Sequence, residues 1–209
     1  MTPENIENLF TRADGQFVFA RWGRPIAPNI FGVEEETLQV VKGALEAVAV
    51  LAGHKMAETD MELGSNLMMF FFSDWAELLD VTGMERLVPD LDPLVARLQA
   101  ADANQYRFFR FDEDGAIKAC FVFLRMDAAL AEMDAQALAL SQIVQSYLLW
   151  SDTAFRDQSP LAIVGEATIL RPDISELIRA AYDPVLPAAA TDASHALRLF
   201  ARMQQREEP

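Results

Sequence analysis

The feature that most constrains the fold is the run at residues 66–72, which is apolar at every position after Asn66 and ends in three consecutive phenylalanines. The run has the length of a strand, and successive side chains of a strand point to opposite faces of its sheet. Because both faces are apolar, both must be buried, which is typical of a central strand. One amphipathic helix cannot cover two faces, so the sequence predicts helices on each side of a sheet.

Helical and extended patterns alternate along the rest of the chain, without an internal repeat or a low-complexity linker. Gly53 is placed to end a long helix, Asp114 and Gly115 supply a hairpin turn, and Asp173 with Glu176 has the spacing of a capping box. The predicted helices are 3–12, 34–52, 74–80, 91–101, 127–150, 173–181 and 192–205. The predicted strands are 17–22, an edge strand at 26–31, the central run, and a hairpin of 106–111 with 116–125, while 159–170 is irregular or partly extended.

These elements predict an α+β fold with a mixed β-sheet and packing helices. With 209 residues and no linker, the chain is expected to form a single domain, 1–209. Its N-terminal helix falls within residues 1–15, and residues 206–209 are expected to be a frayed tail.

The charge of the chain excludes several partners. Asp and Glu number 32 against 17 Lys and Arg, a net charge of -15, which repels nucleic acid and anionic membranes. No apolar run is long enough to span a bilayer, and the first residues lack the pattern of a secretion signal. We therefore expect neither nucleic-acid nor membrane partners, and a cytoplasmic location.

Residues for metal or nucleophilic chemistry are scarce and scattered. Zinc sites need several nitrogen or sulfur ligands at close spacing, whereas the chain offers only Cys120, His54 and His195, far apart. We expect Cys120 to be buried in a strand, His54 to be a solvated residue after a helix end, and His195 to be structural or on the surface. No phosphate-binding loop or serine-nucleophile motif is present, so no catalytic residue, metal or cofactor is predicted.

One polar group around the end of the helix at 127–150 is a candidate binding site. Gln142 and Gln145 are three residues apart and share a helix face, with Tyr147, Ser151 and Asp152 close behind. Amides on a half-buried helix face need hydrogen-bond partners. The alternative is that both glutamines are ordinary surface residues.

The order of several short motifs resembles an uncharacterised bacterial domain-of-unknown-function family that is distantly related to zincin metallopeptidases. No single motif is specific, and the likeness runs over residues 17–196. The motifs are Arg21-Trp22 followed by Pro25, Leu51-Ala52-Gly53, Ser65-Asn66-Leu67, the segment 142–152, and Ala181-Tyr182-Asp183-Pro184.

This resemblance implies a zincin-like scaffold whose reactive residues are missing. Zincins carry two histidine ligands one helical turn apart, with a glutamate after the first. Those positions fall here on Ser141, Gln142 and Gln145, and Leu148 and Ser151 also depart from the family's own glycine and asparagine. A neutral amide cannot take a proton from water as a carboxylate does, and serine and glutamine are poor zinc ligands.

The function that these residues favour is non-catalytic binding of a peptide or protein. Zincin scaffolds present an extended peptide along a sheet edge, and a chain without the metal can keep that groove. Two arginines near a strand end would favour an acidic ligand, although ordinary solvation of a strand end also accounts for them. The candidate contacts are Arg21, Trp22, Arg24, Gln142, Gln145, Tyr147 and Asp152.

Two alternatives remain open from the sequence. One is a hydrolase or peptidase with an atypical site, built from carboxylates with His54 or His195. The other is a subunit of a homo-oligomer, whose surplus of apolar residues forms the interface.

Overall fold

A four-stranded mixed sheet forms the centre of the protein in the computed structural model, which describes residues 1–165 and 167–207. The strand order is β2-β3-β5-β4, in which β2, β3 and β5 are parallel and β4 is antiparallel to β5. The strands are β2 (Pro28–Phe31), β3 (Leu67–Phe72), β4 (Gln105–Phe111) and β5 (Ile117–Arg125). This arrangement leaves β2 and β4 at the two edges of the sheet.

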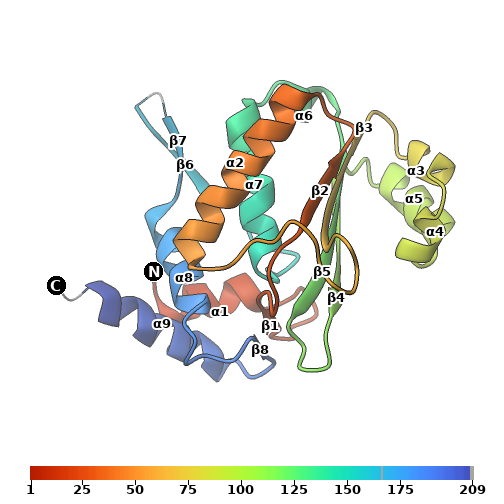
Figure 1. Ribbon diagram of the computed structural model, residues 1–209. Helices are drawn as coiled ribbons and strands as arrows, with labels where there is room; N and C mark the ends of the chain where they lie inside the picture. Colours follow the sequence, from red (N-terminus) through yellow and green to blue (C-terminus); the bar gives the residue numbers. More distant parts are fainter. Residues whose placement is uncertain (166, 208–209) are drawn as a thin grey trace.

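Both faces of the sheet are buried, as the apolar run in β3 predicts. Leu67 and Met69 pack into one hydrophobic cluster, and Phe70 and Phe72 pack into another. Figure 1 shows helices on each side of the sheet, with a small helical group beyond β3 and the other helices on the opposite face. The small group is α3 (Glu77–Asp80), α4 (Met84–Leu87) and α5 (Leu91–Ala100).

The larger core lies on the other face, where α2 and α7 cross the sheet side by side (Figure 1). α1, α8 and α9 pack at one end of this layer, and β1 pairs with β8 beside them. The elements are α1 (Pro3–Phe10), β1 (Phe19–Ala20), α2 (Glu35–Ala52), α7 (Ala135–Tyr147), α8 (Pro172–Ala181), β8 (Ala189–Ala190) and α9 (Ser194–Glu207). The mixed α+β class and the helix-covered mixed sheet agree with the prediction.

The predicted helix 127–150 is wrong in its bounds, because the chain contains two helices there. α6 (Ala128–Ala131) begins after Asp127, whose side chain accepts a hydrogen bond from the Leu130 N–H. Asp134 then caps α7 by accepting from the N–H groups of Gln136 and Ala137. Two capping aspartates therefore start two helices, and α7 ends where Leu148 becomes extended and bridges to Arg21.

Two other predictions need correction, and a third, the partly extended segment 159–170, is made more definite. The strand 17–22 is reduced to β1, with single bridges on either side, because its pairing partner β8 has two residues. Residues 159–170 contain an antiparallel hairpin, β6 (Leu161–Val164) and β7 (Ala167–Leu170). α8 has no capping box, because Pro172 starts the helix and Asp173, already inside it, forms an ion pair with Arg171.

The predicted N-terminal helix is confirmed as α1, and Gly53 ends α2 in the left-handed conformation. The frayed tail 206–209 is not seen at 206 and 207, which belong to α9, and residues 208–209 lie outside the described residues. Over the described ranges, none of the helices combines the length and apolar character needed to cross a membrane.

Candidate functional site

A groove of about 1250 Å³ runs between the edge strand β4 and helix α7. It is lined by β4, by α7, by the chain that follows α7 and by the turn at 12–14. The lining residues used below are Gln105, Arg107, Phe109 and Phe111 of β4, Ser141, Gln142 and Gln145 of α7, and Met133, Trp150, Asp152 and Phe155 around them. The groove therefore follows the strand edge that has no neighbour in the described sheet.

Helix α7 presents the two predicted glutamines to this groove. Gln142 and Gln145 lie on its groove-lining face with Ser141, as their spacing predicts. The Nε2 of Gln145 donates to the Oγ of Ser141 at 3.0 Å. Gln142 is only 2 % exposed, so the alternative of a surface glutamine is wrong for this residue.

A guanidinium from β4 holds Gln142 in place. Nη2 of Arg107 donates to Oε1 of Gln142 and, at 3.3 Å, to Oε1 of Gln105. The Gln142 Nε2 also donates to Gln105 Oε1 at 3.3 Å, which closes a three-residue network between strand and helix. The hydrogen-bond partner that this buried amide needs is thus a cation on a strand 35 residues away in sequence.

Arg107 is half-buried and lacks an acidic partner. Burial lowers its pKa to about 10, although the neighbouring Cys120 acts in the opposite direction, so it remains a cation at neutral pH. Its Nε is buried without a hydrogen-bond partner. Among the ion pairs of the described residues, none involves Arg107.

The rest of the groove combines apolar walls with a polar rim. Trp150 stacks on Phe10 at 5.3 Å between ring centroids and meets Phe155 edge-on at 4.9 Å. Phe111 and Met133 are each 41 % exposed. At the rim, Asp152 accepts a hydrogen bond from the Ala13 N–H at 2.9 Å and so fastens the turn at 12–14 to the chain after α7. An apolar groove with a few fixed polar groups is the usual form of a binding site.

Four predicted site residues lie away from this groove, in the larger core or at its border. Trp22 is fully buried, and its Nε1 donates to the Ser146 carbonyl at 2.9 Å. Tyr147 is 1 % exposed, and burial raises its pKa far above the usual value. Arg21 lies over the Tyr182 ring at 5.4 Å. The expectation that these three join Gln142 and Gln145 in one site is corrected, because none of them lines the groove and all three lie at the C-terminal end of α7.

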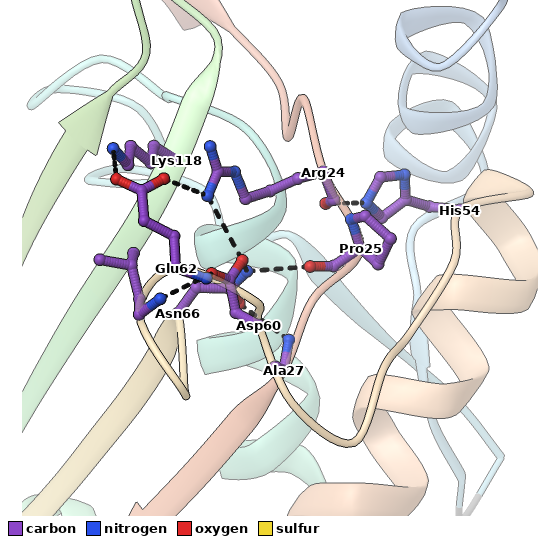
Figure 2. A network of polar contacts seen from close by, with 9 residues as sticks. Arg24, Pro25, Ala27, His54, Asp60, Glu62, Asn66 and Lys118 are labelled. Carbon is purple, nitrogen blue, oxygen red and sulfur yellow. Dashed lines mark hydrogen bonds and ion pairs between the residues drawn. The ribbon is translucent and has the colours of Figure 1, made fainter.

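Arg24 is the fourth, and Figure 2 shows it within a network that fastens the loop after α2. Its guanidinium pairs with Asp60 at 3.4 Å and with Glu62 at 3.1 Å, and Lys118 also pairs with Glu62. Asn66 donates to Asp60 at 3.0 Å and accepts from the Ala27 N–H at 2.8 Å. Arg24 is therefore already paired with two carboxylates of its own chain and does not line the groove.

The Asp60 carboxylate is the centre of this network. Desolvation alone would raise its pKa, but hydrogen bonds from the N–H groups of Leu63 and Glu62, from Asn66, and the charge of Arg24 together lower it below the usual value. The ionised form is thus the one that the loop stabilises.

The histidines and the cysteine also lie outside the groove lining. His54 was expected to be solvated but is half-buried, with its Nε2 2.9 Å from the Arg24 carbonyl oxygen. His195 is 1 % exposed and packs on Phe19 at 4.4 Å between ring centroids, so it is structural. Cys120 is buried in β5 as predicted, and burial raises its pKa to about 12. Within the described ranges, no three His, Cys, Asp or Glu side chains gather as a metal site.

The sequence prediction did not include Arg107 or Gln105. A signal was present, because side chains two apart in a strand share a face, and Gln105, Arg107 and Phe109 therefore point the same way. A polar pair on the inner face of a hairpin strand needs partners across the core.

Comparison with known proteins adds no family, since no family model, curated protein or solved structure matches this chain.

Proposed function

We propose that this protein is a non-catalytic, zincin-like α+β domain that binds an extended peptide segment in the groove between β4 and α7. The segment pairs with the free edge of β4 as an additional strand. Main-chain hydrogen bonds to such an edge give affinity, and pockets for alternate side chains give specificity. The observation that carries the proposal is that the groove follows the open edge of β4 and is also lined by Gln142 and Gln145.

The shape and lining of the groove support a peptide more than a small polar metabolite. Apolar groups at Phe109, Phe111, Met133 and Trp150 extend along it. A protein partner would present the same extended segment. A nucleic acid is disfavoured by the net charge of -15.

The polar groups of the helix support binding without hydrolysis. Ser141, Gln142 and Gln145 occupy the positions at which the resemblance places two metal ligands and a general base. Amides donate and accept hydrogen bonds but do not act as a general base near neutral pH. Neither His54 nor His195 lines the groove, so nothing in its geometry favours the hydrolase alternative.

A calorimetric titration tests the proposal with peptides that alternate valine and threonine and are acetylated and amidated at their ends. We expect saturable binding to the wild-type protein. Replacing two exposed groove residues together, Phe111→Asp and Met133→Asp, should weaken binding about tenfold. Apolar contact with the peptide is lost, and the bound peptide would bury the two new charges.

The matched control is Ile163→Asp, which changes an 80 % exposed apolar residue of β6 outside the groove lining. It should bind as the wild type does. Equal losses in both variants, or no binding by the wild type to any peptide of the series, would contradict the proposal. Light scattering at several concentrations separately decides whether the chain forms a homo-oligomer.

A further inference from the structure

Arg107 is a cation that the fold positions but does not neutralise. Its Nη2 is shared by the oxygens of two neutral amides, Gln105 and Gln142. Its Nη1 makes no hydrogen bond to any described residue, and its Nε is buried without a partner. A half-buried guanidinium with only amide partners keeps part of the cost of its desolvation, which a carboxylate would offset.

The position of Arg107 makes it accessible to a bound segment. It lies in the edge strand and lines the groove together with the two glutamines. It shares a face of β4 with Phe109, which packs against the larger core. Along this face of β4, the charged Arg107 is therefore followed two residues later by the apolar Phe109.

We propose that the bound peptide places an aspartate or glutamate side chain opposite Arg107 and an apolar side chain two residues away, opposite Phe109. This inference rests on the proposed strand binding and adds the identity of the recognised side chain. Directly opposite side chains of paired strands lie close enough to interact, and alternate residues share a face. The carboxylate takes the free Nη1 and supplies the charge partner that Arg107 does not have among the described residues.

The charges around the groove favour a single carboxylate over a polyanion. Asp14, Asp152 and Asp157 line the rim, and the whole chain carries a net charge of -15. These negative charges would repel a ligand that carries several negative charges itself. A single carboxylate, in contrast, would meet Arg107 between two neutral amides.

The test compares three acetylated and amidated peptides of alternating valine and threonine, in which one central residue is glutamate, glutamine or lysine. By calorimetry the wild type should bind the glutamate peptide about tenfold more tightly than the glutamine peptide, and the lysine peptide least. Arg107→Gln should remove the preference and leave the affinity for the glutamine peptide within about twofold. Circular dichroism and thermal unfolding confirm that each variant is folded.

Arg110→Gln is the matched control, because Arg110 lies in the same strand but donates to the carbonyl oxygens of Arg86 and Leu87 on the opposite face. It should keep the glutamate preference. A second variant, Gln142→Glu, supplies a carboxylate to Arg107 from within the chain. It should fold and should lose the preference for the glutamate peptide, and retention of that preference would overturn the inference.

The remaining outcomes separate the two proposals. If the wild type binds glutamate and glutamine peptides equally, Arg107 does not select the ligand, although strand binding stands. If a free C-terminal carboxylate raises the affinity of the glutamine peptide as much as the glutamate does, Arg107 recognises the carboxylate of a chain end. The proposed recognition of an internal acidic side chain is then wrong. If no peptide binds, both the proposed function and this inference fail.

Discussion

Gly32 ends β2 with a φ of 81°, and a Cβ built at this position would lie 2.0 Å from the carbonyl oxygen of Phe71. The clash is with backbone of the central strand, so it cannot be relieved by a side-chain rotation. Positive φ adds strain for any residue with a side chain. Because residue 32 has no Cβ, the chain can leave the edge strand β2 while its backbone stays in close contact with β3.

Gly32→Ala is therefore expected to lower the free energy of unfolding by about 3 kcal/mol or more, since strained φ and backbone overlap add. The matched control is Gly43→Ala in the exposed middle of α2, where no atom lies within 4 Å of the added Cβ. That change should stabilise the protein by about 0.5–1 kcal/mol through helix propensity. Urea unfolding of the two variants measures both values, and equal effects would show that the Gly32 backbone relaxes.

Residue patterns predict part of the candidate site because they report which side chains share a face. The three-residue spacing of Gln142 and Gln145 places both on the groove side of α7. The same spacing cannot report what lies opposite, and Arg107 reaches Gln142 from a distant strand. Trp22 and Tyr147 look like binding residues in the sequence, but aromatic groups satisfy a core as well as a ligand, and here they are buried.

At the level of elements, β3 was predictable because all six of its residues, Leu67–Phe72, are apolar, so that both of its faces are apolar. The break between α6 and α7 was not, because residues 128–139 are rich in alanine and leucine and fit a continuous helix. An aspartate inside such a pattern reads equally as an exposed helical residue or as an N-cap. Side-chain hydrogen bonds to the backbone distinguish the two, and these depend on the folded loop.

Asp134 is the N-cap of α7, the helix that contains Gln142 and Gln145. Its side chain accepts hydrogen bonds from the N–H groups of Gln136 and Ala137, both at 3.0 Å. Asp134→Ala should cost about 1 kcal/mol of stability, the usual value of an N-cap. Glu34→Ala is the control, because Glu34 holds the N-cap position of α2 without a side-chain cap bond and should change stability by less than about 0.5 kcal/mol. Thermal unfolding compares them, and equal shifts would contradict the assigned cap.

Across the whole molecule, the larger core joins elements from both ends of the chain, and His195 lies where they meet. α1 and α9 pack together, and His195 of α9 contacts Phe19 of β1. Neither ring nitrogen has a hydrogen-bond partner. Burial, followed by the positive charges of Arg198 and Arg21, lowers the pKa of His195 to about 4. The folded protein therefore holds this ring neutral under conditions in which the unfolded chain binds a proton.

The direction of the resulting pH dependence follows from that difference. The ordinary pKa of histidine is 6.5, so between pH 6.5 and about 4 the unfolded state binds more protons at this position than the folded state. Stability should be highest above pH 6.5 and fall as the pH falls toward 4, by at most about 1.4 kcal/mol per pH unit for one group. The pKa of His54 is also lowered, first by desolvation, and adds in the same direction.

Replacing the ring by one that does not titrate, His195→Phe, should reduce this slope while keeping an aromatic contact with Phe19. Asp60, whose pKa is lowered, should still destabilise the variant at lower pH, because its stabilising charge is lost as the pH falls through its folded pKa. Urea unfolding from pH 7 to pH 3.5 measures both regions. If wild type and variant show the same slope between pH 6.5 and 4, the histidine is not held neutral, and the acid sensitivity of the core has another origin.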